Sequence, residues 1–206
     1  MILYDYWRSS AAYRVRIGLN ILGLAYTSVP VDLTKAAHKS PEHLARNPQG
    51  LVPALAIDGL MLTQSLTILE YLDESRGGGF LPADAVGRAR VRMVAYAIAM
   101  EVAPVCNLSV RTYAAELSGG AVTADDWVRH FMVPGLVAVE AMLGTGRYCH
   151  GDTVTLADLC LVPQIYNARR AGIDMTAMPR INAVMAELEA LPAVAAAHPD
   201  RHQPQG

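Results

Sequence analysis

The sequence predicts an α/β domain followed by an all-helical domain, and three observations carry this prediction. Short β-prone runs bounded by turn residues occur only in the first eighty of the 206 residues. Beyond Pro82, apolar residues recur instead at helical spacing. A hydrophobic content of 52% with 17% charged residues provides enough apolar side chains for a sizeable core and excludes intrinsic disorder for most of the chain.

The first domain is expected to alternate strands and helices. The first helix follows Ser9 and Ser10 and ends at Gly23, where a glycine can adopt the left-handed cap. A strong two-residue hairpin signal, Asp58-Gly59, separates the last two β-prone runs. The expected strands cover 2–6, 27–31, 54–57 and 60–63, and the later helices cover 41–47 and 65 to about 75. The order βαβαββα is that of a thioredoxin-like domain.

The second domain should contain only helices, over residues 88–117, 125–143, 156–171 and 178–191. We therefore expect domains at 1–79 and 83–206, joined by the glycine-rich segment that begins at Gly77. Thr155 and Asp158 form a capping box, so we interpret Asp158 as a structural acid. The apolar stretch 93–110 contains Glu101 and Pro104, which favours a buried helix over a membrane span.

Charge and cysteine content exclude several classes of function. A net charge of −2 lacks the basic footprint of nucleic-acid binding. The N-terminus has no basic leader, and we expect no membrane association. Cys106, Cys149 and Cys160 form no CxxC pair, which favours a reducing cytoplasm over a disulfide framework or a zinc site. The histidines show no ligand spacing with a carboxylate partner, so no metal is expected.

The strongest local signal for chemistry is the pair Ser9-Ser10, which places two hydroxyls where a strand turns into a helix. Considered alone, such a pair is typical of a helix N-cap. Three arginines within nine residues, Arg8, Arg14 and Arg16, favour a functional site over a simple helix cap. Arg14 lies on the same helical side as Ser10, whereas Arg16 projects roughly opposite Arg14, so at most one of these two faces a site. The motifs of serine hydrolases, zinc proteases and phosphate-binding loops do not occur.

The run SSAAYRVRI, residues 9–17, resembles the S-S-C-x-W-R-V-R-I signature of the zeta-class glutathione transferases. Further motifs match in order: NPQGLVP at 47–53, QS at 64–65, NLSV at 107–110, and GD at 151–152 through LADLCLVPQ at 156–164. The resemblance covers essentially the whole chain. It departs from the family at Ala11, where the signature has cysteine, at Tyr13, where it has tryptophan, and at Cys106, where the family often has glutamine.

This resemblance implies glutathione as the cofactor. Ser9 would donate a hydrogen bond to the glutathione sulfur, with Ser10 and the amide of Ala11 completing the positive end of the helix. Lowering the thiol pKa by two units takes about 2.7 kcal/mol, which a hydroxyl donor plus a helix N-terminus can supply. Val52, followed by a cis Pro53, would pair with the cysteinyl unit. The implied catalytic residues are Ser9 and Ser10, and the implied cofactor-binding residues are Ser9, Ser10, Ala11, His38, Val52, Pro53, Gln64, Ser65 and Asn107.

The family resemblance also implies a small dicarboxylate substrate, an enedione held by Arg8, Arg14 and Arg170. The thiolate would add to the cis double bond, which can then rotate before elimination returns the trans isomer. The leading hypothesis is isomerisation of maleylacetoacetate in tyrosine and phenylalanine breakdown. The alternatives are the sister activity on maleylpyruvate, a transferase or dehalogenase that consumes glutathione, and a noncatalytic adaptor. Because family members are homodimers, a homodimer is expected.

Overall fold

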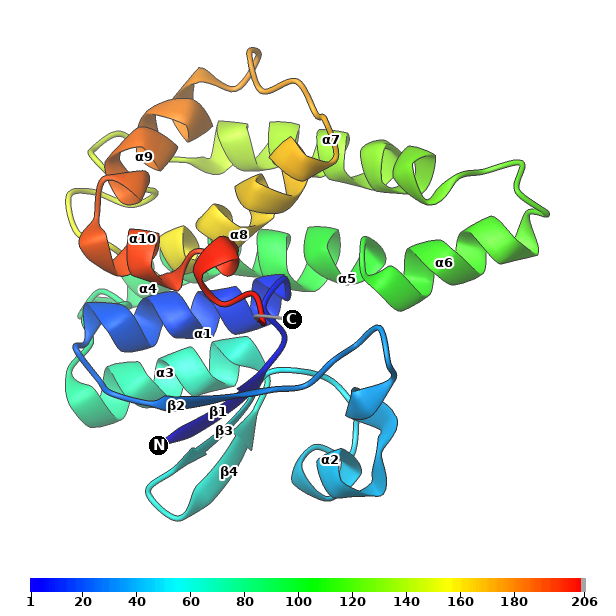
Figure 1. Cartoon of the computed structure of the whole chain (residues 1–206). Helices are drawn as coiled ribbons and strands as arrows, with labels where there is room; N and C mark the ends of the chain where they lie inside the picture. Colours follow the sequence, from blue (N-terminus) through cyan, green and yellow to red (C-terminus); the bar gives the residue numbers. More distant parts are fainter. Residues whose placement is uncertain (205–206) are drawn as a thin grey trace. The chain divides into compact units, whose positions relative to one another are not determined.

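The computed structural model describes residues 1–204 (Figure 1). The chain forms two compact units. The first unit contains Met1–Phe80 and the segment from Glu189 onward, and the second contains Leu81–Leu188. The sequence pattern assigns the C-terminal segment to the helical domain, whereas the structure packs α10 (Pro192–Ala197) against α1 (Ser10–Ile21). Asn20 Nδ2, near the end of α1, donates to Ala193 O at 3.1 Å.

The first unit is built on a four-stranded mixed sheet with strand order β2-β1-β3-β4 (Figure 1). Its strands are β1 (Ile2–Asp5), β2 (Thr27–Pro30), β3 (Ala54–Ile57) and β4 (Leu60–Thr63). β1 pairs with β2 in parallel and with β3 antiparallel, and β3 and β4 form the hairpin. Asp58 and Gly59, at its turn, both have positive φ, as a two-residue hairpin turn requires. The predicted order βαβαββα is confirmed.

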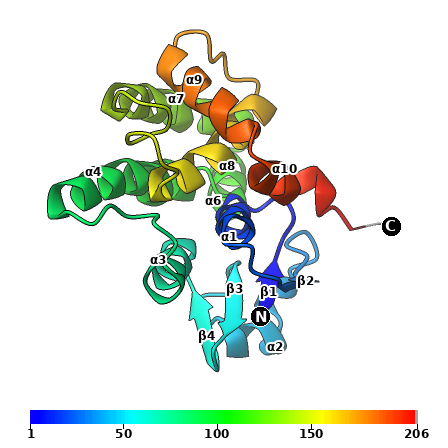
Figure 2. The same ribbon diagram turned by 90° about the vertical axis from the view of Figure 1, so that its left-hand side faces the viewer.

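Helices α1 and α3 (Ser65–Arg76) lie together on one side of the sheet (Figure 2). Leu3 and Leu55 project toward these helices, while the neighbouring Ile2 is exposed, because side chains alternate across a strand. The buried cluster consists of Leu3, Val15, Leu19, Leu55, Ile57, Ile68 and Leu72. The remaining helical segments are α2 (Pro41–Arg46) and the 3₁₀ turns Ala37–Lys39 and Pro199–Arg201. This core fixes α1, and with it the Ser9-Ser10 corner, against the sheet.

The second unit contains helices only among its described residues, as the sequence predicts. They are α4 (Ala85–Tyr96), α5 (Ala103–Val105), α6 (Leu108–Leu117), α7 (Ala124–Met142), α8 (Leu156–Arg170) and α9 (Pro179–Glu189), with a π-helical segment, Ala97–Val102, between α4 and α5. The capping box of α8 is confirmed, since the Asp158 carboxylate accepts from the Thr155 amide at 2.7 Å and the Cys149 amide at 2.8 Å. Asp158 is fully buried, and burial raises its pKa.

The expectation of a buried helix at 93–110 is wrong. The apolar run lies within Ala85–Leu117, the succession of helical segments from α4 to α6. Within residues 1–204 this is the one helical stretch long and apolar enough to cross a membrane by length and composition alone, with a mean hydropathy of 1.5. Only 22% of its most apolar window is buried. A high apolar content predicts a covered surface, but it does not show whether this chain itself provides the cover.

A close approach between α7 and the π-helical segment gives a first prediction. A Cβ added at Gly135 would lie 2.3 Å from Val102 Cγ2, and Val102 is a stiff, buried, β-branched residue. We expect Gly135→Ala to lower the free energy of unfolding by about 1–2 kcal/mol in urea titration, because the overlap outweighs the better helix propensity of alanine. Adding Val102→Ala should recover part of this loss. A Gly135→Ala variant more stable than wild type would contradict the close approach.

Candidate active site

The predicted cofactor-binding segments meet at one end of the sheet. Ser9 follows the C-terminal end of β1, and Val52 and Pro53 come directly before β3, whose first residue, Ala54, pairs with Tyr4. Gln64 and Ser65 follow β4, whose last residue, Thr63, pairs with the same Ala54. The strand register therefore gathers three segments that are far apart in the sequence.

Ser9 is the N-cap of α1. Its Oγ accepts from the Ala12 amide at 3.2 Å, and α1 begins at Ser10. The N-cap interpretation is therefore confirmed. It is compatible with a hydrogen bond from Ser9 to the glutathione sulfur, because capping uses a lone pair of the hydroxyl while its proton stays available to a second acceptor. Ser10 and Ala11 lie in the first turn, where free amides and the helix dipole favour an anion.

The Val52-Pro53 peptide bond is cis, as the family resemblance implies. Gln64, at the N-terminus of α3, has a φ of 66°, and its Nε2 donates to Gln49 Oε1 at 2.7 Å. Ser65 is buried at the first position of α3, and its Oγ accepts from Arg14 Nη1 at 3.3 Å. The bond from Arg14 ties the start of α3 to α1.

The arginines of the signature take different positions. Arg14, expected to bind substrate, is only 3% exposed, so its guanidinium lies within the first unit against Ser65. Arg16 is fully buried and pairs with Asp5 at 2.6 Å, in agreement with its opposite direction on the helix. Arg8 is half-buried in the loop before Ser9, where Nη2 donates to the Tyr6 hydroxyl at 3.2 Å. Of these three arginines, only Arg8 has a guanidinium next to the Ser9 corner that is not buried.

The other predicted site residues are spread over both units. His38 lies in the 3₁₀ turn Ala37–Lys39, and burial, followed by the charge of Lys39, holds the pKa of His38 below its usual value. Asn107 is the N-cap of α6, and Arg170 is the last residue of α8, with its guanidinium 5.6 Å from the Tyr166 ring. Asn107 and Arg170 belong to the second unit, whereas the segments around Ser9 belong to the first.

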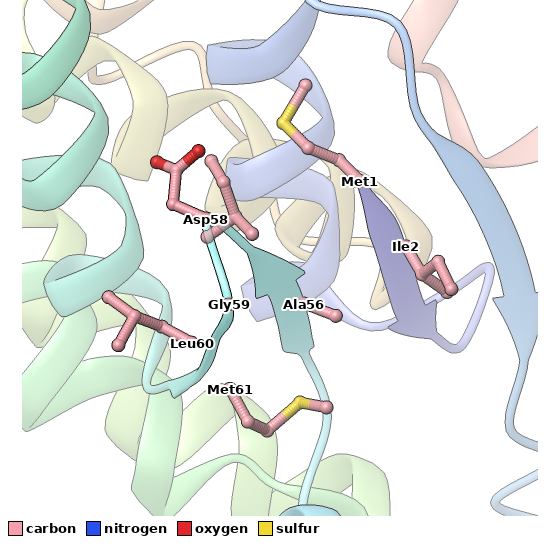
Figure 3. A pocket seen from close by; sticks show the side chains of 8 residues that line it. Met1, Ile2, Ala56, Asp58, Gly59, Leu60 and Met61 are labelled. Carbon is pink, nitrogen blue, oxygen red and sulfur yellow. The ribbon is translucent and has the colours of Figure 1, made fainter.

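A hollow of about 540 Å³ lies where β1 begins and β3 turns into β4 (Figure 3). Ser9 follows the other end of β1. Its lining includes Met1, Ile2 and Met61, around the turn of the β3–β4 hairpin. Its one titratable side chain, Asp58, is bonded to the Tyr71 hydroxyl at 2.7 Å and to Arg76, and these bonds hold the pKa of Asp58 below its usual value. The hollow therefore offers mainly apolar surface, and its one titratable side chain is already hydrogen-bonded.

A second hollow, of about 350 Å³, lies at the C-terminal ends of β1 and β2 and is lined in part by Trp7, Arg8, Asp32 and His202. The sequence patterns did not connect the C-terminal segment with the Ser9 corner. They also missed Gln49, which bonds to Gln64. Gln49 lies inside the matched NPQGLVP motif, so the motif itself was the signal for it.

Comparison with known proteins identifies the family. The profile of the glutathione S-transferase N-terminal domain matches residues 1–74, and that of the C-terminal domain matches residues 132–196. The chain is 55% identical to maleylacetoacetate isomerase of Rhizobium meliloti, over 98% of each chain. Among solved structures, a bacterial maleyl pyruvate isomerase described as a zeta-class glutathione-S-transferase superposes with a TM-score of 0.94, 40% identity and complete coverage of both chains. This chain belongs to the zeta class of the glutathione transferases.

A second solved relative is maleylacetoacetate isomerase of Methylobacterium extorquens AM1, with bound malonate and glutathione. It shares 43% identity with this chain and a TM-score of 0.93, and the match covers 99% of this chain and 98% of that one. The family resemblance predicted from five motifs is confirmed.

In this zeta-class transferase, Tyr13 replaces the tryptophan of the signature. Its side chain is buried and meets the His198 ring edge-on, with ring centroids 6.2 Å apart.

Proposed function

We propose that this zeta-class transferase catalyses the glutathione-dependent cis–trans isomerisation of maleylacetoacetate to fumarylacetoacetate in tyrosine and phenylalanine breakdown. The supporting observation is the convergence of Ser9, Val52, Gln64 and Ser65 at one end of the sheet. The identity to the Rhizobium isomerase extends over nearly the whole of both chains. A noncatalytic adaptor would not need these groups at one place.

The residues at this end of the sheet fit a glutathione molecule. Glutathione, when bound, supplies a thiolate that adds to the cis double bond. The Ser9 hydroxyl proton, not needed for capping, stabilises the sulfur anion together with the first turn of α1. Gln64 and Ser65 hold the γ-glutamyl end, where the N-terminus of the twelve-residue α3 favours a carboxylate. His38 is assigned to the glycyl carboxylate and Asn107 to a further contact with the cofactor.

The substrate is a dianion, and arginine recognises carboxylates through paired hydrogen bonds. We assign Arg8 and Arg170 to the substrate carboxylates. Arg14, which the sequence analysis expected at the substrate, is assigned instead to orienting the Ser65 hydroxyl toward the cofactor. Its buried guanidinium already bonds to Ser65.

The experiment that tests this function follows the loss of the cis enedione absorbance with maleylacetoacetate and with maleylpyruvate. We expect turnover of maleylacetoacetate that needs glutathione but leaves its concentration unchanged. Maleylpyruvate is the second candidate, since the maleyl pyruvate isomerase structure superposes with a TM-score of 0.94. Activity with maleylpyruvate alone would reject the first choice, and stoichiometric consumption of glutathione would indicate a transferase or dehalogenase.

We also propose that the protein is a homodimer. Val86, Met93 and Met100 recur every seven residues along α4 and the π-helical segment, and each is more than half exposed. An apolar stripe of this kind on one helix is typical of a surface that a partner covers. The same proposal places the protein in the cytoplasm, which the free thiols of its three cysteines support.

Charged residues in this stripe should separate the subunits. We expect the double variant Met93→Glu, Met100→Glu to sediment as a monomer at concentrations where the wild type sediments as a dimer, because two carboxylates would lose their hydration in the interface. Leu117→Glu is the matched control, since Leu117 is even more exposed but lies on α6. A monomeric wild type, or a dimeric double variant, would refute the assignment of this stripe.

A further inference from the structure

Two buried side chains hold a single backbone carbonyl beside the cis proline. Asn47 Nδ2 donates to Leu51 O at 2.9 Å, and His43 Nε2 lies 2.9 Å from the same oxygen. Both side chains belong to residues that are only 1% exposed. Because a carbonyl oxygen only accepts, the proton of the second bond lies on His43 Nε2. The oxygen of Leu51 therefore has both lone pairs engaged by the interior of the loop.

Fixing this oxygen also fixes the next amide. The Leu51 carbonyl and the Val52 N–H belong to one planar trans peptide unit, in which C=O and N–H point in opposite directions. Since the carbonyl points into the loop toward Asn47 and His43, the Val52 N–H points the other way. Within residues 1–204 this N–H has no hydrogen-bond partner. The loop therefore presents a free backbone donor at the end of the sheet where the cofactor segments meet.

Asn47 also connects this donor to the other side of the site. Its Oδ1 accepts from the Gln49 amide at 3.1 Å, and the Gln49 side chain accepts from Gln64 Nε2 at 2.7 Å. A continuous chain of hydrogen bonds thus runs from Leu51 through Asn47 and Gln49 to Gln64. A rigid network of this kind holds binding groups at fixed positions before a ligand arrives, which lowers the entropic cost of ordering them on binding.

We propose that Asn47 and His43 are positioning residues of the glutathione site. They hold the Leu51-Val52 peptide so that its N–H faces the cysteinyl unit, and Asn47 couples this peptide to Gln64. The inference rests on the proposed assignment of Val52 and Gln64 to glutathione. Neither Asn47 nor His43 touches the cofactor in this proposal, so both act on its affinity and not on the chemical step.

The test is steady-state kinetics with varied glutathione, together with calorimetric titration of glutathione into each folded variant. We expect Asn47→Ala and His43→Phe each to raise the KM for glutathione about tenfold while kcat at saturating glutathione changes less than twofold, the loss expected for one hydrogen bond. His43→Gln, whose amide nitrogen can replace Nε2 as donor, should restore most of the affinity. Asn20→Ala is the matched control, because Asn20 also donates from Nδ2 to a carbonyl in the first unit, near the far end of α1.

Gln49→Ala keeps the test decisive if a buried variant does not fold, because Gln49 is exposed and its loss should leave folding unchanged. We expect this variant to raise the KM for glutathione about threefold. An unchanged KM in folded Asn47→Ala and His43→Phe, when Gln64→Ala raises it, would overturn the positioning role and leave the glutathione site intact. An unchanged KM in Gln49→Ala would overturn the coupling of Asn47 to Gln64. An unchanged KM in Gln64→Ala would instead refute the assignment of Gln64 in the proposed function.

Discussion

Replacing Ser9 by alanine is expected to lower kcat about tenfold to a hundredfold. The Oγ of Ser9 accepts the Ala12 amide at 3.2 Å, so its proton is the part of the group that stabilises a sulfur anion. A hydrogen bond to a charged group contributes about 1.5–3 kcal/mol, and each 1.36 kcal/mol corresponds to about one pH unit in the thiol pKa. The pKa of bound glutathione, measured from thiolate absorbance against pH, should therefore rise by about one to two units.

Two comparison variants separate this effect from the loss of a helix cap. Ser9→Gly also removes the hydroxyl. Glycine at an N-cap lowers stability by only about a few tenths of a kcal/mol, whereas alanine lowers it by about 1 kcal/mol. Both variants should lose the same activity and differ in stability. Thr123→Ala, which removes the cap of α7, should lower stability and leave kcat unchanged. Wild-type kcat in Ser9→Gly would remove Ser9 from the mechanism.

The sequence predicted those parts of the fold that local chemistry determines. The Asp58-Gly59 turn required two residues with positive φ, and the structure has them there. Gly23 follows the first helix in the left-handed conformation, as its position indicated. The capping box at Thr155 and Asp158 also formed as predicted. In each case, neighbours within a few residues supply all the partners.

The features that the sequence did not predict depend on distant partners. The segment of α10, PAVAAA, carries no polar pattern that would show which unit it joins, and its place is fixed by carbonyls that accept from α1. The single helix expected over 88–117 is interrupted twice. The π-helical segment follows α4, where Pro104 has no N–H to bond back to the preceding turn, and α5 ends at Val105 before α6 begins at Leu108. The exposure of its apolar stripe was missed because a composition does not reveal which molecule covers it.

The candidate site was predictable only through family motifs. The strand register brings Ser9, Val52 and Gln64 to one end of the sheet, and no local pattern contains that register. Helical periodicity correctly placed Arg14 and Arg16 on different sides of α1. It could not show that both would be buried, because the groups they bond to, Ser65 and Ala197, are 51 and 181 residues away.

Replacing Arg16 by methionine is expected to lower the free energy of unfolding by roughly 3–5 kcal/mol, because it leaves a buried carboxylate without its partner. Arg16 Nη1 donates to Asp5 at 2.6 Å, Nη2 to Trp7 O at 2.9 Å and Nε to Ala197 O at 3.2 Å. The other oxygen of Asp5 accepts from Ser28 at 2.9 Å. One guanidinium therefore joins β1, the loop before Ser9 and α10. Urea denaturation measures the loss.

A double variant separates the cost of the unpaired Asp5 carboxylate from the cost of the lost hydrogen bonds to Trp7 O and Ala197 O. Arg16→Met with Asp5→Leu removes the unpaired carboxylate, so stability should recover in part, since buried ion pairs can be replaced by apolar residues with little net cost. Recovery should stay incomplete, because the carbonyls of Trp7 and Ala197 still lack a donor. Full recovery would mean that these two bonds contribute nothing. A single variant as stable as wild type would contradict the buried pair itself.

The pKa of His202 gives a second readout of Arg16 that does not depend on unfolding. Burial, and after it the charge of Arg16, hold the pKa of His202 below its usual value. Removing that charge should therefore raise the pKa of His202 in the folded protein, which NMR titration of its ring protons measures. Because Trp7 O is two residues from Ser9, Arg16→Met should also lower kcat in the fraction that remains folded. A change in pKa without a change in kcat would show that Arg16 anchors α10 but does not position Ser9.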